Sequence, residues 1–169
     1  HIISVLVANK SGALTRISGL FARRSYNIDS LSVCATEDKQ LSRMTITSIA
    51  DENTMQQIIK QLSKLYDVRK VTELDRETSV ARELLRVKVR MPAERRPEIE
   101  STCHIYKAKL IDLSPASVIL ELTGEPNKID GFLKVVSPYG IIEMTRTGLS
   151  ALERGQTSIN DLADYNETL

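Results

Sequence analysis

The first half of the chain has a pattern of apolar and polar residues that predicts the order strand, helix, strand, strand, helix, strand. The four strands are expected at residues 2–8, 28–35, 41–49 and 68–74. Two apolar stripes at helical spacing predict the helices: Leu14, Ile17, Leu20 and Phe21 within residues 12–24, then Met55, Ile58, Ile59, Leu62 and Leu65. The acidic and polar residues 51–54 are typical of the start of that second helix.

The second half repeats this order after a charged stretch. Its strands are expected at residues 85–91, 109–113, 118–123 and 140–147. The first helix is expected to begin near Glu94 or Arg95, and Asn127 is expected to cap the second. The inward-facing residues are then Ile99, Cys103 and Tyr106 in the first helix and Ile129, Phe132, Leu133 and Val136 in the second.

Two successive βαββαβ units predict an α+β fold with two ferredoxin-like sandwiches in tandem, each an antiparallel sheet with both helices on one face. We expect a first domain at residues 1–76, a linker at 77–82, a second domain at 83–149 and a polar tail at 150–169. Since the helices cover one face of each sheet, the open faces and edges are expected to need partners, which predicts a homodimer or a higher oligomer.

Composition removes several classes of function. The chain of 169 residues has a net charge of +1, so no general field attracts nucleic acid or an anionic membrane. Aromatic residues make up 4 % of the chain, and the basic strand at residues 86–90 has no aromatic residues for stacking bases; a solvated or partner-facing strand is favoured there. No apolar run approaches the length of a membrane span. A bacterial cytoplasmic location is expected, or a plastid one if a targeting segment preceded His1.

Catalytic and metal-binding residues are scarce. The two histidines, His1 and His104, have no neighbouring ligands at helix or hairpin spacing, so no metal site is expected and His104 is placed on a helix surface. The cysteines Cys34 and Cys103 are far apart in the sequence, and neither has a histidine at a spacing typical of a nucleophile. Both thiols are therefore expected to pack as small hydrophobic groups. We predict no catalytic residues and no cofactor bound by this chain.

The candidate site is the corner at which the first strand turns into the first helix. Asn9, Lys10, Ser11 and Gly12 form this turn, and a helix N-terminus offers free N–H groups that favour a carboxylate or a phosphate. A simple strand-to-helix turn is the alternative interpretation. A second polar segment follows the helix and includes Asn27. This residue either ends the helix in a left-handed conformation or provides a hydrogen-bonding side chain at a sheet edge.

The combination of motifs resembles the small regulatory subunit of acetolactate synthase, also called acetohydroxyacid synthase, over residues 2–155. In the first half it rests on Ser4-Val5-Leu6-Val7, Asn9-x-Ser11-Gly12-Ala13-Leu14, Leu20-Phe21-Ala22-Arg23-Arg24, Tyr26-Asn27-Ile28-Asp29-Ser30-Leu31, Thr36-Glu37-Asp38, Leu41-Ser42-Arg43-Met44-Thr45 and Gln61-Leu62-x-Lys64-Leu65-x-Asp67-Val68. In the second half it rests on Arg82-Glu83-Leu84, Ile111-Asp112-Leu113, Leu122-Thr123-Gly124, Tyr139-Gly140-Ile141 and Thr145-Arg146-Thr147-Gly148.

The resemblance implies an amino-acid-sensing ACT domain followed by an ACT-like domain. It implies a non-catalytic subunit that activates a catalytic large subunit and confers feedback inhibition by valine, sometimes leucine or isoleucine. Thiamine diphosphate, Mg and FAD are then expected on the catalytic subunit. In this family two protomers pair their ACT sheets edge to edge, with the effector in the seam. The implied effector-binding residues are Asn9, Lys10, Ser11, Gly12, Ala13 and Leu14 from one protomer and Asn27, Ile28 and Cys34 from the other.

The sequence departs from the family pattern at two positions, and two other classes of protein are alternatives. Lys10 stands where relatives usually have an acidic residue, and Cys34 stands where a small residue is common. A free-standing ACT-type sensor of another biosynthetic enzyme is the first alternative. A small ferredoxin-like enzyme such as an acylphosphatase is the second, and residues 12–16 match its phosphate loop poorly.

Overall fold

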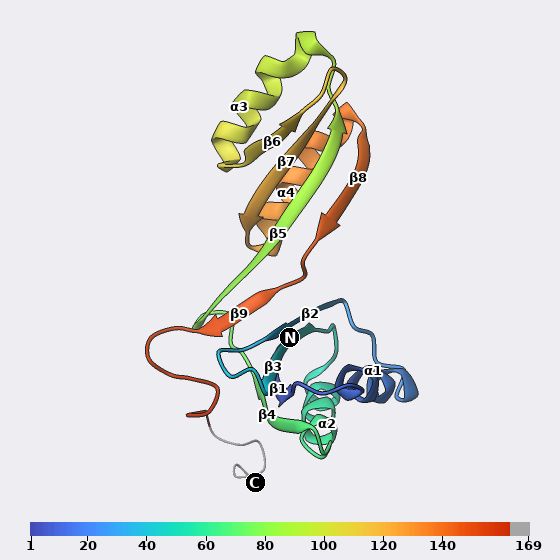
Figure 1. Ribbon diagram of the computed structural model, residues 1–169, viewed down its shortest axis with the longest axis vertical. Helices are drawn as coiled ribbons and strands as arrows, with labels where there is room; N and C mark the ends of the chain where they lie inside the picture. The colour runs from blue at the N-terminus through green and yellow to red at the C-terminus, as the bar shows by residue number, and fades with distance from the viewer. Residues whose placement is uncertain (163–169) are drawn as a thin grey trace. The chain divides into compact units, whose positions relative to one another are not determined.

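The computed structural model describes residues 1–162 and divides into two compact units. The first unit combines residues 1–81 with residues from 149 onward, and the second unit comprises residues 82–148 (Figure 1). Each unit has an antiparallel sheet with two helices against it, so the predicted α+β fold with two tandem ferredoxin-like sandwiches is confirmed.

The first unit has the sheet order β2-β3-β1-β4. Its elements are β1 (Ile2–Ala8), α1 (Ala13–Arg23), β2 (Ser30–Ala35), β3 (Leu41–Thr47), α2 (Glu52–Leu62) and β4 (Val68–Glu73). Both neighbours of β1 run antiparallel to it, with Val5 opposite Met44 on one side and Val71 on the other. All three of these side chains are buried in the core under α1 and α2, as alternation along a strand requires.

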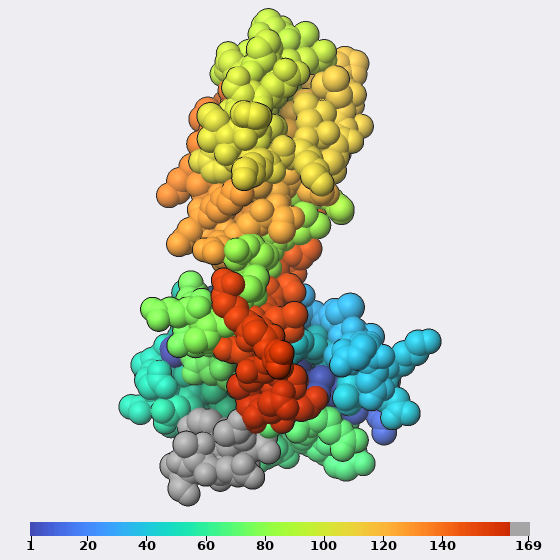
Figure 2. Space-filling model, turned by 90° about the vertical axis from the view of Figure 1, so that its left-hand side faces the viewer, coloured from blue at the N-terminus to red at the C-terminus, as the bar shows by residue number. Residues whose placement is uncertain are grey.

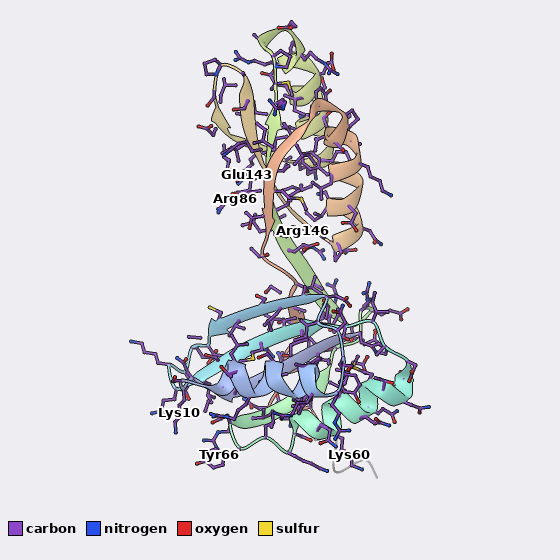
Figure 3. The ribbon with its side chains drawn as sticks, turned by 90° about the vertical axis from the view of Figure 1, so that its right-hand side faces the viewer. Lys10, Lys60, Tyr66, Arg86, Glu143 and Arg146 are labelled. Carbon is purple, nitrogen blue, oxygen red and sulfur yellow. The ribbon has the colours of Figure 1, made fainter. Side chains whose placement is uncertain are left out.

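The second unit has the sheet order β6-β7-β5-β8. Its elements are β5 (Ser79–Arg90), a 3₁₀ turn (Ala93–Arg95), α3 (Arg96–Tyr106), β6 (Lys109–Leu113), β7 (Ser117–Gly124), α4 (Pro126–Val136), a 3₁₀ turn (Ser137–Tyr139) and β8 (Ile141–Arg146). Leu85, Val87 and Val89 of β5 point into the core beneath α3 and α4. On the opposite face, Arg86 pairs with Glu121 at 2.9 Å and Lys88 with Glu143 at 2.5 Å, within a strand face that is largely solvated, as the sequence predicted (Figure 3).

The residues after 149 differ from the expected polar tail. A ninth strand, β9 (Ser150–Glu153), pairs with β5, and the buried Leu149 and Ala151 form a third apolar cluster with Ile2 and Leu74. This segment lies across the first unit (Figure 2). Farther along, Ile159 is buried. The last part of the predicted tail, residues 163–169, lies outside the described residues.

The C-terminal segment also corrects the expectation that the first sheet has an open face. The outward-alternating residues Ser4, Leu6 and Ala8 of β1 are buried, although the helices cover the other face. The Lys70 ammonium donates to the Asn160 carbonyl at 3.4 Å, and Lys70 stands opposite Leu6 in the register. Leu149 and Ala151 therefore cover Ile2 at one end of this face, and at the buried Ser4 the Arg43 Nε donates to the hydroxyl at 3.0 Å.

Several boundaries shift for local reasons. The expected linker at 77–82 is already strand from Ser79, because β9 pairs with this part of the chain. The cap of α4 is Glu125 rather than Asn127, since Pro126 takes the first helical position, where its missing N–H costs nothing. After α1 the left-handed residue is Ser25, not Asn27. Cys103 is buried as expected, whereas Cys34 is exposed on the edge strand β2 and does not pack in this chain.

Candidate functional site

The corner between β1 and α1 is a tight turn that ends on Gly12. Gly12 occupies the N-cap position of α1 with φ 89°, a left-handed conformation that glycine adopts without steric cost. The Asn9 N–H donates to the Gln40 carbonyl at 2.7 Å, and the Lys10 N–H donates back to the Ala8 carbonyl at 2.8 Å. These two bonds fix the turn at the end of the sheet and direct the following backbone toward solvent.

The turn leaves a row of open backbone donors. Within residues 1–162, the N–H groups of Ser11, Gly12, Leu14 and Thr15 have no hydrogen-bond partner, and that of Ala13 reaches the Lys10 carbonyl only at 3.4 Å. Gly12 has no side-chain cap, and the first turn of α1 has no acidic residue. Unpaired N–H groups at the positive end of a helix dipole form a site for an anion.

Asn9 is anchored beside this row through its side-chain amide, which donates to the Lys39 carbonyl at 3.0 Å. That bond leaves the Oδ1 atom as an acceptor on the exposed side of the corner. Lys10 and Ser11 are exposed, Ala13 is buried in the core, and Leu14 is exposed at the rim. Figure 3 shows Lys10 and Tyr66 at the same end of the first unit, where this corner lies. The corner thus presents donors, one amide acceptor and an apolar side chain together.

Arg16 and Asp67 complete the corner, and the sequence analysis assigned neither of them to the site. The Arg16 guanidinium lies above Gly12, so that a Cβ at Gly12 would come within 3.1 Å of Arg16 Nη1. Arg16 Nε donates to the Asp67 carboxylate, which is 5 % exposed, while the Arg16 side chain is 50 % exposed. The Asp67 carbonyl in turn accepts from the Ala8 N–H at 2.8 Å. A positive charge is therefore held beside the open donors.

One chain does not bring all the predicted site residues together. Ala35, at the end of β2, pairs with Ser42 of β3, which stands opposite Val7 at the corner end of β1. Cys34 is one residue before Ala35 and therefore lies at this end of the sheet. Ser30 pairs with Thr47, which stands opposite Ile2 at the far end. Asn27 and Ile28 precede β2 and therefore lie at that far end.

The far-end residues have their own contacts. The Asn27 side chain donates to the Asp29 carboxylate at 2.6 Å, and its carbonyl accepts from the Ser48 hydroxyl at 2.7 Å. Ile28 packs against the core while Asn27 is exposed. The interpretation of Asn27 as a hydrogen-bonding group at the sheet edge is thus the one that fits its backbone and contacts.

Other candidate sites gain no support. Among residues 1–162 no group of three or more metal-ligating side chains comes together, and His104 is exposed on α3 as predicted. No helix in the described part of the chain is long and apolar enough to cross a membrane.

Comparison with known proteins assigns both units to one family. Residues 3–70 match the model of the AHAS small subunit-like ACT domain, and residues 82–155 match that of the small subunit of acetolactate synthase. The chain is 44 % identical over 159 residues to the acetolactate synthase small subunit of Mycolicibacterium smegmatis, covering 94 % of each chain. It is 43 % identical over 156 residues to the isozyme 3 small subunit of Escherichia coli, covering 92 % of this chain and 96 % of that one.

A solved structure agrees with these sequence matches. The crystal structure of the acetolactate synthase small subunit from Thermotoga maritima superposes with a TM-score of 0.86 at 38 % identity, and the match covers 93 % of this chain and 98 % of that one. The similarity therefore extends over both units.

Proposed function

Because this chain belongs to the acetolactate synthase small-subunit family, we propose that it is the regulatory subunit of that enzyme and that it binds valine at the β1–α1 corner. The single observation that carries the ligand assignment is the row of open N–H groups at Ser11, Gly12, Leu14 and Thr15, with the Arg16 guanidinium beside it. In this proposal the chain activates the catalytic large subunit and confers feedback inhibition on it.

A free amino acid fits the chemistry of the corner. Its carboxylate would take the open N–H groups, and its ammonium would be accepted by the Oδ1 atom of Asn9 or by a nearby carbonyl. The Leu14 side chain offers apolar contact to an isopropyl group. Regulation at metabolite concentrations needs a Kd of only about 0.1 mM, or roughly −5.5 kcal/mol, which two or three charge-assisted hydrogen bonds and one buried side chain can supply.

The strand order supports a site shared by two copies. The edge strand β2 is open, and an antiparallel partner β2 related by two-fold symmetry would run in the opposite direction along it. Its beginning, with Asn27 and Ile28, would then come to the end that carries Cys34 and the β1–α1 corner of the first copy. We propose that the effector binds in this seam and that its contacts with both protomers favour one dimer geometry over others.

Catalysis is assigned to the partner in this proposal. This assignment rests on the match of the chain to acetolactate synthase small subunits over most of its length. Thiamine diphosphate, Mg and FAD remain predictions for the catalytic large subunit, and a cytoplasmic location remains a prediction for the complex.

The test combines calorimetry with reconstitution. The full chain is titrated with valine, leucine and isoleucine and is then assayed with the catalytic large subunit. In Gly12→Asp the new carboxylate sits beside the open N–H groups and within reach of the Arg16 guanidinium, so it competes for both with the ligand carboxylate. We expect at least a tenfold loss of valine affinity and of valine inhibition, with activation of the catalytic subunit retained.

Gly19→Asp is the matched control, because Gly19 lies on the same helix and a Cβ there meets only Arg23 Nη1 at 3.7 Å. This variant carries the same added charge and should respond to valine like the parent. If Gly12→Asp is still inhibited at the parental valine concentration, the site is wrong. If neither variant nor parent changes the activity of the catalytic subunit, the regulatory assignment fails instead.

A further inference from the structure

His1 lies at the far end of the first sheet, where three segments of the first unit meet. The Ser48 N–H, after β3, donates to the His1 carbonyl at 3.4 Å, and the Leu74 N–H, after β4, donates to the Ile2 carbonyl at 2.8 Å. The His1 side chain is 22 % exposed. Its ring therefore lies between the ends of β3 and β4 and is mostly shielded from solvent.

Both ring nitrogens of His1 contact hydrogen-bond acceptors. Nδ1 contacts the Glu73 carboxylate, and Nε2 lies 3.0 Å from the Ala50 carbonyl oxygen. A carboxylate and a carbonyl oxygen accept hydrogen bonds and donate none, whereas a neutral imidazole carries a single N–H. The neutral ring can therefore bond to only one of these groups, and the imidazolium can bond to both. The geometry is that of a protonated ring.

The charges around the ring also favour the cation. The hydrogen bond to Glu73 is the largest cause of a raised pKa of His1, and partial burial of the ring acts in the opposite direction. The charge of Glu73, the Ala50 carbonyl and the charge of Glu52 in α2 raise this pKa further. Other charged groups at this end are the amino group of His1, which donates to the Ser48 carbonyl at 3.3 Å, and the residues that line the open hollow beside the ring, Asp75, Arg76 and Glu77. Carboxylates therefore outnumber cations around the ring.

The ring is bonded to a segment that contacts two other parts of the first unit. Ala50 precedes Asp51, which is the N-cap residue of α2. The Ser48 hydroxyl donates to the Asn27 carbonyl at 2.7 Å, and Ser48 lies two residues before Ala50. The bond between the His1 ring and Ala50 therefore ties the start of α2 and the backbone of Asn27 to β4.

We propose that His1 is a pH-sensitive switch in the first unit: the protonated ring joins Glu73 of β4 to Ala50 before α2, and the neutral ring releases one of the two. Because the pKa of His1 is raised in the folded chain, the protonated ring stabilises the fold fully below the ordinary histidine pKa of about 6.5. This stabilisation is lost as the pH rises through the raised value. The segment around Ala50 is thus held more firmly below the raised pKa of His1 than above it.

NMR titration of the full chain tests the protonation of the ring. The chain has two histidines, so a His104→Gln background leaves His1 as the only source of imidazole signals. In that background the titration midpoint of His1 should lie at a higher pH with Glu73 present than in Glu73→Gln, which removes the charge that contacts Nδ1. Asp75→Asn is the matched control, because Asp75 lines the same hollow but its carboxylate accepts from the Glu77 N–H and not from the ring. It should lower the midpoint by less than half as much.

Hydrogen exchange of the Ser48 amide tests the release, each rate being divided by the intrinsic rate at that pH. The protection of this amide should fall at least threefold as the pH rises through the His1 midpoint. It should not change in His1→Gln, whose side-chain amide does not titrate, nor should that of the Thr36 amide, which donates to the Leu41 carbonyl at 2.9 Å at the other end of the sheet. An equal midpoint with and without the Glu73→Gln substitution, or constant protection of Ser48 across the midpoint, overturns the proposal. Neither readout involves valine or the catalytic large subunit, so the outcome is separate from that of the proposed function.

Discussion

Gly12 illustrates how much of the candidate site a sequence can predict. Its neighbours Asn9 and Ser11 mark a polar turn before an apolar helical stripe, and the turn, the helix start and the open N–H groups all lie where that pattern predicts them. Arg16 and Asp67 were not assigned to the site because the contact between them spans 51 residues of sequence. The one local signal was that Arg16 stands one helical turn after Gly12, a spacing that places both on the same face.

The Arg16–Asp67 ion pair predicts a measurable coupling. Asp67 is nearly fully buried, so Arg16→Met leaves its carboxylate without the guanidinium and should lower the free energy of unfolding of the first unit by about 1–3 kcal/mol. In an Asp67→Asn background the same substitution removes no ionic partner and should cost less than about 1 kcal/mol. Urea unfolding of the four chains measures this cycle.

Equal costs of Arg16→Met in the two backgrounds would mean that the guanidinium contributes by packing over Gly12 and not by pairing with Asp67. Lys10→Met serves as the control, because Lys10 is an exposed cation at the same corner. Its replacement should change the stability of the first unit by no more than about 0.5 kcal/mol.

Helix starts show where sequence patterns succeed and fail at the level of single elements. Asp51 was predicted at the start of α2, and its carboxylate accepts from the Thr54 N–H at 2.8 Å and from the Thr54 hydroxyl at 3.1 Å. At α4 the sequence pattern predicted Asn127 as the cap. Proline is favoured in the first turn of a helix, so α4 begins at Pro126 and Glu125 is the N-cap residue. β9 escaped prediction because four residues are too few for a periodic signal, and its partner β5 extends into the charged stretch.

The Asp51 cap predicts a pH dependence. The hydrogen bond from the Thr54 N–H is the larger cause, and that from the Thr54 hydroxyl the smaller, of a lowered pKa of the Asp51 carboxyl. The ionised form of Asp51 is therefore the one stabilised in the folded chain. The stabilisation is fully present above the ordinary aspartate pKa of about 3.9 and is lost as the pH falls through the lowered value. Asp51→Ala should therefore be less stable than the parent at pH 7, and the difference should shrink below about pH 4.

Asp51→Ser distinguishes the charge from the cap. Serine is also a good N-cap but does not titrate, so its advantage over alanine should stay constant across the same pH range. NMR signals of α2 followed through urea unfolding at several pH values provide the measurement. A parent advantage that persists unchanged in acid would show that Asp51 acts through its shape alone.

At the scale of the whole molecule, the first unit is discontinuous in sequence. Leu149 and Ala151, which follow the second unit in the chain, share an apolar cluster with Ile2 and Leu74. The tandem order of two ferredoxin-like units was predictable because each repeats a periodic pattern. The return of the chain to the first unit was not, since residues 150–169 are mostly polar and, as far as residue 162, only the isolated positions Ala151 and Ile159 are buried.

The discontinuity can be tested with two leucines of the same segment. Leu149 is 4 % exposed, so Leu149→Ala should leave a cavity and lower the free energy of unfolding of the first unit by about 2–4 kcal/mol. Leu152, in β9, is 56 % exposed, and Leu152→Ala should change it by no more than about 0.5 kcal/mol. Hydrogen exchange of β1 and β4 amides reports on the first unit separately. Equal effects of the two substitutions would contradict the proposed role of the segment.

The return of the chain has a consequence for biosynthesis. A ribosome releases the other strands and helices of the first unit long before it translates β9. The nascent first unit therefore has to wait for its last strand while the entire second unit is made and folded. Until then Ile2 and Leu74 lack the contacts of Leu149 and Ala151, and the nascent chain displays these apolar side chains. Translation that stalls or terminates early should accordingly yield products that chaperones retain and proteases remove, even though every residue of the β1–α1 corner has already been synthesised.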